Sequence, residues 1–350
     1  MSIQASIAIR EQAPALAEQV VDNIYRRQRE RWGSYGEEGR QKSVRDAGYH
    51  LRYLAEALAA DDAALYTEYL AWVKVLFAGL NFSPSVLHDT LAEMHAVISE
   101  SVPENMRAEI LEVLESGRRE VEAEPVLPPS FLDGDGEMDQ LAREFLASLL
   151  DGNRRQASEM ILAAVQSGVT VKKIYAQVFE RTQREVGRLW QINSISVAQE
   201  HFCTAATQMV MSQLYPYIFT GQRTGRRMVM ACVGGELHEI GARMVADFFE
   251  MEGWDTYFVG ANMPAKSVLQ SVEELQADIL AISATMTFHV GQVAEMIQEL
   301  RKTRSKQQTR VLVGGYPFNL APQLWQKVGA DGCARDAATA LQEAEKVMTE

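Results

Sequence analysis

The sequence predicts a multidomain protein with an all-α N-terminal domain, a central four-helix bundle and a C-terminal α/β domain built on a doubly wound parallel sheet. The chain has 350 residues, more than a single core usually contains. Helical periodicity runs through residues 1–220 and is interrupted at 123–137. After residue 221, short β-rich apolar runs alternate with helical stretches, which is typical of a parallel sheet covered on both faces.

The composition indicates which partners and which cellular compartment to expect. A formal net charge of −13 opposes sequence-independent attraction to nucleic acid, which depends on cations meeting phosphates. No apolar run approaches the roughly 20 residues that span a bilayer, and the N-terminus lacks the basic and apolar segments of a secretory signal. The three cysteines fit neither a disulfide framework nor a thiolate zinc site. We therefore expect a cytoplasmic protein that binds neither nucleic acid nor a membrane.

The helical part of the chain is expected to form two domains. Before Glu122, apolar residues recur at three- and four-residue spacing, as in Leu51, Leu54 and Leu58, which predicts an all-α domain over residues 1–122. Residues 123–137 are rich in Pro, Gly and acids and are expected to be a linker. The helical pattern returns at 138–220 as four segments, with short connections near residues 152–153, 167–168 and 191–196 that are typical of an antiparallel bundle.

Residues 221–350 are predicted to form a doubly wound, flavodoxin-like α/β domain. The expected strands are Met228–Val233, Thr256–Val259, Ile279–Ser283 and Val311–Val313. Helices are expected to begin near Glu239, Ala265, Phe288 and Leu320. Because ligands of such sheets bind outside the carboxyl ends of the strands, the turns after the strands are the candidate sites.

Three of these turns carry an unusual pattern. The segment Gly234–Gly241, with the sequence GGELHEIG, follows the first expected strand, Ser283-Ala284-Thr285 follows the third, and Gly314-Gly315 follows the fourth. The pattern and its spacing resemble the cobalamin-binding domains shared by methionine synthase, corrinoid proteins and mutases, whose turns carry D-x-H-x-x-G, then S-x-L or S-x-T, then G-G. This chain departs from that pattern at Glu236, where the family has Asp.

The resemblance implies that His238 binds cobalt from the lower side of the corrin ring. A neutral imidazole nitrogen suits cobalt, and a carboxylate two residues earlier can accept the other ring N–H and fix the tautomer, a role that Glu236 has the reach to fill. Ser283 and Thr285 are expected to hydrogen-bond the nucleotide tail of the cofactor. The other residues that the resemblance places at the cofactor are Leu237, Glu239, Ile240, Gly241, Gly314 and Gly315.

The bundle carries a second resemblance. Trp190 ends its third helical segment, and Glu200 and His201 fall in the first turn of the fourth, after a capping box that begins at Ser196. The spelling W-x9-E-H resembles the cap of the cobalamin-dependent light-sensing transcription repressors, in which these residues cover an adenosyl group. An indole offers stacking area to adenine, and a carboxylate accepts hydrogen bonds from ribose. The resemblance therefore implies adenosylcobalamin as the cofactor.

The N-terminal helices have the length of a globin-like domain, and the arrangement of the whole chain resembles photocobilins, in which a globin-like bilin-binding domain precedes the adenosylcobalamin module. This resemblance implies biliverdin as a second chromophore. No cysteine precedes Cys203, so a thioether-linked bilin within this domain is excluded. Haem ligated by His88 or His50 is the alternative. The residues taken as bilin contacts are Arg45, His50, Arg52, Tyr53 and Trp72.

These resemblances lead to the hypothesis of a light sensor that is not an enzyme. Photolysis of adenosylcobalamin would free the bundle and change the assembly of a homodimer or its contact with a separate effector. The chain departs from the repressors in two ways. Gln191 stands where they have a histidine that can take the vacated cobalt face, so His201 or water is the candidate for that position here. Their basic DNA-binding module has no counterpart, so DNA binding is not expected. A corrinoid methyl carrier of a methyltransferase system, which also places a helical bundle before this domain, and a non-photochemical cobalamin or redox sensor stay open.

Overall fold

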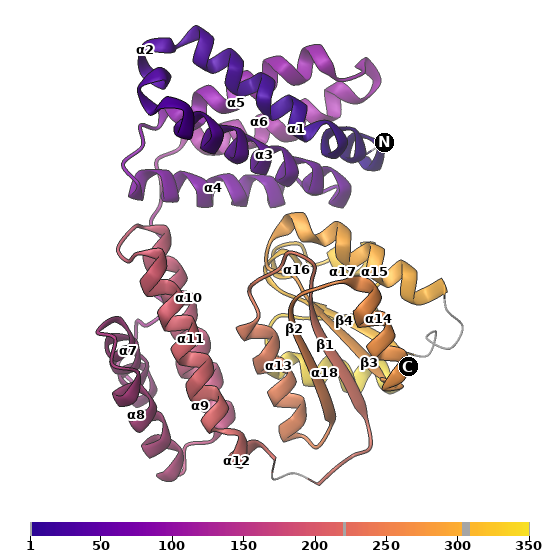
Figure 1. Ribbon diagram of the computed structural model, residues 1–350. Coiled ribbons are helices and arrows are strands. Elements are labelled where there is room, and N and C mark those ends of the chain that lie inside the picture. Colours follow the sequence, from indigo (N-terminus) through magenta and orange to yellow (C-terminus); the bar gives the residue numbers. More distant parts are fainter. Residues whose placement is uncertain (1, 220–221, 303–308, 350) are drawn as a thin grey trace. The chain divides into compact units, whose positions relative to one another are not determined.

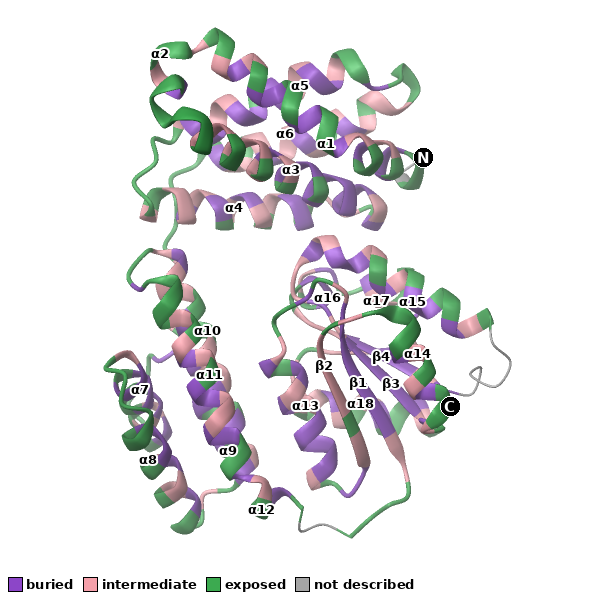
Figure 2. Ribbon diagram, in the orientation of Figure 1, coloured by how far each residue is buried: buried purple, intermediate pink, exposed green. Residues whose placement is uncertain are grey.

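The computed structural model describes residues 2–219, 222–302 and 309–349 and divides them into two compact units (Figure 1). The first unit ends at Leu127 and the second begins at Pro128. Each unit has its own buried core, as the purple segments of Figure 2 show. The expected boundary between residues 220 and 221 lies outside the described residues.

The first unit is all-helical, as predicted. Helix α1 packs along α3 and α5, and α6 packs against α4 and α5. Pro84 and Pro103 directly precede α5 and α6, at positions where no backbone N–H is needed. The globin-like character of this unit stays a prediction. Its helices are α1 (Ser2–Arg27), α2 (Arg29–Trp32), α3 (Gly36–Ala60), α4 (Ala64–Gly79), α5 (Ser85–Ser101) and α6 (Glu104–Glu122), with a 3₁₀ turn, η1, at Gly33–Tyr35.

The bundle opens the second unit and contains the four expected helical segments. The third segment runs without a break through a π-helical turn, Tyr175–Phe179, between α9 and α10. Phe145, Ile161 and Phe179 are fully buried in the bundle core. The predicted capping box is present, because Ser196 and Gln199 hydrogen-bond each other's backbone N–H. The helices are α7 (Glu137–Leu150), α8 (Arg154–Gln166), α9 (Val171–Ile174), α10 (Glu180–Gln191), α11 (Val197–Gln213) and α12 (Tyr215–Ile218).

The rest of the second unit is a parallel five-stranded sheet with strand order β2-β1-β3-β4-β5. This is the flavodoxin-like order. Helices α13 and α18 pack together on one face, and α14 and α15 pack together on the other (Figure 1). The strands are β1 (Arg227–Val233), β2 (Asp255–Met263), β3 (Ile279–Ser283), β4 (Arg310–Gly314) and β5 (Gly332–Ala334). The helices are α13 (Ile240–Met251), α14 (Ala265–Glu274), α15 (Val290–Lys302), α16 (Tyr316–Leu320), α17 (Leu324–Lys327) and α18 (Ala337–Thr349), with a 3₁₀ turn, η3, at Thr287–His289.

The prediction for the end of the chain was wrong in one respect. A helix was expected to begin near Leu320, but Leu320 ends the short helix α16. The chain then forms α17, the edge strand β5 and the long helix α18, none of which was predicted. Strand β5 has only three residues and no β-branched side chain, so it has little sequence signal of its own. Pairing with β4 forms it.

One helix of the sheet, α13, joins the sheet to the bundle. Ile240, Met244 and Phe248 lie four residues apart on one stripe of α13 and belong to the bundle core. Beside this stripe, Gln208 of α11 donates to Glu239, which precedes α13, over 2.8 Å. The contact sets α11 against the turn that follows β1. Among the described residues, no helix combines the length and apolarity needed to cross a membrane.

Candidate functional site

The three turns that carry the sequence pattern meet at one edge of the sheet. In the parallel register, Cys232 of β1 lies beside Ser283 of β3, and Ser283 lies beside Gly314 of β4. The strand order reverses between β1 and β3, because β1 leads to β2 on one side while β3 leads to β4 on the other. Such a reversal leaves a crevice outside the carboxyl ends of the strands, which is where doubly wound sheets bind ligands.

Glu236 and His238 form a tight pair in the turn after β1. One carboxylate oxygen, Oε1 of Glu236, accepts hydrogen bonds from the backbone N–H of His238 over 3.0 Å and from its Nδ1 over 2.5 Å. Glu236 is completely buried, whereas the His238 side chain is 60% exposed. The carboxylate therefore engages Nδ1 and leaves Nε2 as the nitrogen that can bind a metal.

The backbone around this pair is held in an uncommon conformation. Gly235 has a φ of +80°, and its N–H donates to Oδ1 of Asn262 over 2.7 Å. Asn262, itself at a φ of +53°, returns a hydrogen bond from its backbone N–H to the carbonyl of Glu236 over 2.9 Å. Asn tolerates this left-handed region better than most residues. The turn after β1 is thus tied to the end of β2.

The charges at the site favour an ionised carboxylate beside an imidazole. Burial acts to raise the pKa of Glu236, but hydrogen bonds from His238 and His289 outweigh it and hold the pKa well below its usual range. The hydrogen bond to Glu236 raises the pKa of His238, and the nearby carboxylate of Glu200 on the bundle adds to this effect. Glu200 and His238 therefore lie close enough to interact electrostatically.

The second and third turns contribute backbone groups to this edge of the sheet, and the expected contacts of Ser283 and Thr285 with the nucleotide tail stay a prediction. The N–H of Thr285 donates to Oε2 of Glu236 over 2.7 Å. A Cβ on Gly315 would lie 2.0 Å from the carbonyl oxygen of Ala284, so only glycine fits there. Gly314 is nearly as restricted, because its Cβ would lie 2.9 Å from the carbonyl oxygen of Ala334. Ser283 is half-buried at the end of β3.

The other predicted residues of the first turn differ in their placement. Leu237 is 71% exposed beside His238, and Gly241 is exposed with open space around its Cβ position. Ile240, in contrast, is buried in the bundle core. The carboxylate of Glu239 is already engaged by Gln208 and by the backbone N–H of Ala261.

The cap residues lie at the adjoining ends of α10 and α11. Trp190 is half-buried against the bundle core, and Gln191 beside it is buried. Glu200 accepts a hydrogen bond from Thr204 over 3.2 Å and pairs with Nδ1 of His201. The side chain of His201 is 75% exposed.

The predicted N-terminal residues differ in their burial. His50 is buried and shares a hydrogen bond with the hydroxyl of Tyr69 over 2.8 Å, and Tyr53 stacks on the ring of Tyr69 with centroids 3.5 Å apart. Burial lowers the pKa of His50 to about 4. Arg45 and Arg52 lie on the exposed side of α3, Trp72 is 40% exposed on α4, and His88 is half-buried on α5.

His289 is the functional candidate that the sequence analysis missed. It lies in η3, is 4% exposed, and its Nδ1 is 3.1 Å from Oε2 of Glu236. The available signal was its distance along the chain, because His289 follows the Ser283-x-Thr285 turn at the start of the next helix. That signal is weak, since a histidine there is equally consistent with an exposed first turn.

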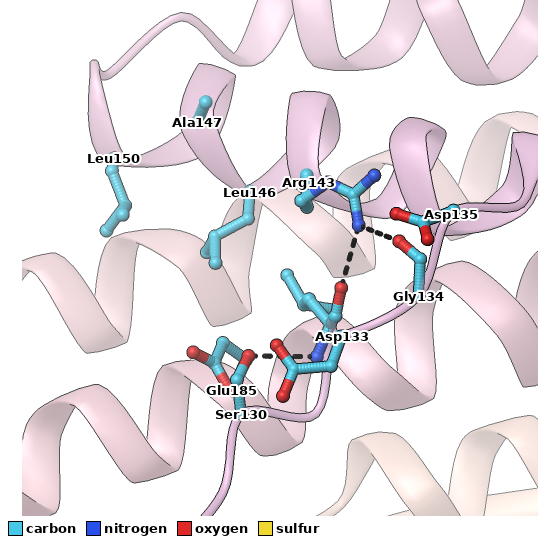
Figure 3. A pocket seen from close by; sticks show the side chains of 10 residues that line it. Ser130, Asp133, Gly134, Asp135, Arg143, Leu146, Ala147, Leu150 and Glu185 are labelled. Carbon is cyan, nitrogen blue, oxygen red and sulfur yellow. Dashed lines mark hydrogen bonds between the residues drawn. The ribbon is translucent and has the colours of Figure 1, made fainter.

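A cavity of about 520 Å³ lies elsewhere in the second unit (Figure 3). Arg143 of α7 crosses its wall and donates to the carbonyl oxygens of Leu132 and Gly134. The cavity is not formed by the three turns that carry the sequence pattern. Within the described part of the chain, no group of three or more His, Cys, Asp or Glu residues has a metal-binding arrangement. Its lining residues are Ser130, Leu132, Asp133, Gly134, Asp135, Arg143, Leu146, Ala147, Leu150 and Glu185.

The fold and site define a cobalamin-binding module, and comparison with protein families agrees. The B12 binding domain family matches residues 226–345, and a second B12 binding domain family matches residues 141–215. The two matches cover the sheet and the bundle. The first 120 residues match the phycobilisome protein family over residues 1–120.

Similar proteins share both the bundle and the sheet. A dimethylamine corrinoid protein of Methanosarcina acetivorans is 26% identical over 214 residues, which are 59% of this chain and 96% of that protein. A corrinoid protein of Desulfitobacterium hafniense is 25% identical over 214 residues, 59% of this chain and 97% of that protein. The solved monomethylamine corrinoid protein of Methanosarcina barkeri has the same fold over 60% of this chain and 99% of its own, with 21% identity and a TM-score of 0.53.

These relatives correct the sequence-based hypothesis of function. Corrinoid proteins match the bundle and the sheet together over nearly their whole length, which contradicts a light sensor and agrees with the alternative of a corrinoid methyl carrier. The expectation that the chain is not itself an enzyme is confirmed, because the relatives are corrinoid-carrying proteins. The spelling W-x9-E-H was the basis of that hypothesis, and it did not predict the function that the similar proteins support.

Proposed function

We propose that the protein is a corrinoid methyl carrier that delivers a methyl group between separate methyltransferases. The main support for this proposal is the Glu236–His238 pair, which lies at the carboxyl edge of a sheet that corrinoid proteins share with this chain. When bound, a corrinoid supplies a cobalt atom that accepts and releases a methyl group. The residues present fit such a cofactor, because an exposed imidazole with an engaged Nδ1 is suited to bind cobalt through Nε2.

The chain's own residues would hold the cofactor from two sides. From below, Glu236 fixes the tautomer of His238, and Gly314 and Gly315 leave backbone free for the close approach of the nucleotide tail. From above, we propose that Trp190 and Glu200, at the ends of α10 and α11, cover the cofactor. The carboxylate of Glu200 adds to the rise in the pKa of His238, which supports this role for Glu200. A carrier must also expose the upper face to its partners, so the contact between bundle and α13 must open.

The identity of the upper ligand is the finer part of this proposal. A methyl carrier must bind methylcobalamin, and its bound corrinoid must accept a methyl group. The stacking area of Trp190 would also suit adenosylcobalamin. We propose methyl as the working ligand and use the adenosyl form as the comparison. We also propose that the protein acts with separate methyltransferases, forms a dimer and is located in the cytoplasm.

A second ligand is proposed for the first unit. Biliverdin, bound without a covalent link, would use the aromatic and basic side chains of α3 and α4, among them His50, Tyr53, Arg52 and Trp72. Addition of biliverdin to the full chain, followed by gel filtration, gives a red absorption band that elutes with the protein if the proposal holds. A band only with haem, or free biliverdin after filtration, contradicts it.

The carrier function is tested by methylating the bound cofactor. The full chain is loaded with hydroxocobalamin, reduced with a strong reductant and treated with methyl iodide under dim red light. We expect the absorption spectrum of protein-bound methylcobalamin and retention of the methyl group after gel filtration. A protein that retains adenosylcobalamin but releases methylcobalamin, or whose bound cofactor cannot be methylated, contradicts the proposal.

Two variants make the methylation test specific to the upper face. Trp190→Ala is expected to weaken binding of alkylated cobalamins about tenfold while leaving hydroxocobalamin binding nearly unchanged, because we propose that the indole stacks on the upper ligand. Val197→Ala is the matched control, since Val197 lies in the same hairpin and is 55% exposed. Equal losses with all forms of cobalamin show that Trp190 supports the bundle instead.

A further inference from the structure

We propose that His289 is a positioning residue that holds Glu236, and through it the cobalt ligand His238, in register. The inference rests on the proposed function, because it assumes that His238 binds the cobalt of a corrinoid. It assigns a role to a buried side chain on a different element from the motif that contains His238. The carboxylate of Glu236 contacts both histidines.

The carboxylate of Glu236 is shared between two imidazoles. Oε1 faces His238, as described above, and Oε2 accepts hydrogen bonds from the backbone N–H groups of Thr285 and Met286 over 2.7 and 3.0 Å. The Nδ1 of His289 adds a third contact to Oε2 over 3.1 Å. A completely buried carboxylate is costly unless its oxygens are saturated, and here both oxygens are engaged.

The ring of His289 is itself fixed by packing. Its side chain is 5% exposed, and the edge of the Phe288 ring meets it with centroids 4.5 Å apart. A Cβ on Gly235 would lie 3.1 Å from its Nε2, so the first turn closes over the ring. The ring therefore has little freedom to rotate, and it presents Nδ1 to Glu236.

The geometry predicts that His289 restricts rotation of the Glu236 carboxylate, which a residue that only fills space would not do. The backbone donors of Thr285 and Met286 approach Oε2 from the end of β3, and His289 is the only side chain among the described residues seen to donate to that oxygen. Without it the carboxylate can rotate about its terminal bond, because the backbone donors alone leave its plane less constrained. Rotation moves Oε1 away from Nδ1 of His238. Loss of such an outer partner typically weakens metal binding about 10- to 100-fold.

The test compares two amides at position 289. His289→Asn places an amide nitrogen near the position of Nδ1 and is expected to keep the Glu236 contact. His289→Gln places its amide nitrogen near the position of Nε2 and is expected to lose that contact, although it is similar in size and polarity. Val293→Ala on α15 is the control for packing, because Val293 is fully buried and is not among the hydrogen-bond partners of Glu236.

The readout is the axial nitrogen on cobalt. Each full-length protein is produced with ¹⁵N-histidine, loaded with cobalamin and reduced to the paramagnetic cobalt form, whose resonance lines split into a doublet when the axial nitrogen is ¹⁵N and into a triplet when it is ¹⁴N from the cofactor tail. We expect the doublet in wild type, Asn and Val293→Ala proteins, and an at least tenfold lower doublet fraction in the Gln variant. Equal doublet fractions in the Asn and Gln variants overturn the role of His289. A triplet in the wild type instead overturns the assignment of His238 as ligand, so the two failures are distinguishable.

Discussion

Tyr175 of the bundle donates a hydrogen bond to Asp247 of α13 over 2.7 Å, and both side chains are buried. The contact lies where the bundle core continues onto α13, next to Phe248. It joins the third helical segment of the bundle to the helix that follows the Glu236–His238 turn. Under the proposed carrier function, a motion that separates the bundle from α13 would break this bond.

The Tyr175–Asp247 contact predicts a pH-dependent bundle–sheet interface. Burial raises the pKa of Asp247 to about 6, against an ordinary value of 3.8, with Glu250 adding to the rise and Tyr175 and Arg243 opposing it. Because the folded pKa is the higher one, the stability that this group contributes is complete below about pH 4 and is lost as the pH rises through about 6. The difference of about two units corresponds to about 3 kcal/mol.

The variant Asp247→Asn isolates this effect. The amide oxygen still accepts from Tyr175 but does not ionise, so the variant is expected to lose less stability between pH 4 and 7 than the wild type. Hydrogen exchange of the α13 peptides measures the opening free energy within this unit. If the opening free energies of the two proteins change equally with pH, ionisation of Asp247 does not destabilise this interface and the prediction is wrong.

The first unit is expected to respond to pH in the opposite direction. Burial lowers the pKa of His50 to about 4 from 6.5, so the folded pKa is the lower one. The stability that depends on neutral His50 is present above about pH 6.5 and is lost as the pH falls through about 4, again by about 3 kcal/mol. His50→Gln should remove this acid sensitivity from the α3 peptides in hydrogen exchange, while the α13 peptides of the second unit should still lose stability as the pH rises. Unchanged acid sensitivity of α3 contradicts the prediction.

Two glycines of the site differ in whether the backbone around them leaves room for a side chain. Gly315→Ala is expected to destabilise the second unit by at least about 2 kcal/mol, because the new Cβ meets the carbonyl of Ala284 at 2.0 Å and φ is +111°. Gly241→Ala is the matched variant, since nothing lies within 4 Å of its Cβ position. Thermal unfolding and cobalamin titration of both variants test this. Similar behaviour of the two would mean that strand β4 shifts to accept a side chain.

The buried charge of Glu236 is expected to be needed for cofactor binding. Glu236→Gln keeps the shape but removes the anion that accepts from His238, and we expect cobalamin affinity to fall about 10- to 100-fold. Glu295→Gln on the exposed side of α15 controls for the change in net charge. Absorption titration with hydroxocobalamin gives both affinities. Wild-type affinity of the Gln variant would show that the neutral amide orients His238 equally well.

The elements that the sequence predicted correctly are those with strong local patterns. The predicted strand Ile279–Ser283 has the observed bounds, and the other three predicted strands lie within the observed ones. Buried parallel strands are continuous apolar runs, so they stand out from the flanking helices. The capping box at Ser196 is equally local, because it needs only two side chains three residues apart.

What was missed depends on partners that are distant in the chain. Strand β5 exists because β4 offers an edge, and His289 matters because it meets Glu236, 53 positions earlier. Neither relation leaves a local signature. The predicted bilin contacts show the same limit, since periodicity placed His50 and Arg52 in one helix but did not show that one is buried and the other exposed.

The motif in the turns was enough to identify a cobalamin-binding module, because three short patterns at set spacing mark the carboxyl edge of one sheet. Folding decided how that motif is built: a Glu in place of Asp reaches both His238 and His289, and its burial makes every donor around it count. The spelling W-x9-E-H did not decide function, since it predicted a light sensor whereas the similar proteins are corrinoid proteins. Function rests on contacts between elements, and hydrogen bonds within a buried site form only when those elements have packed.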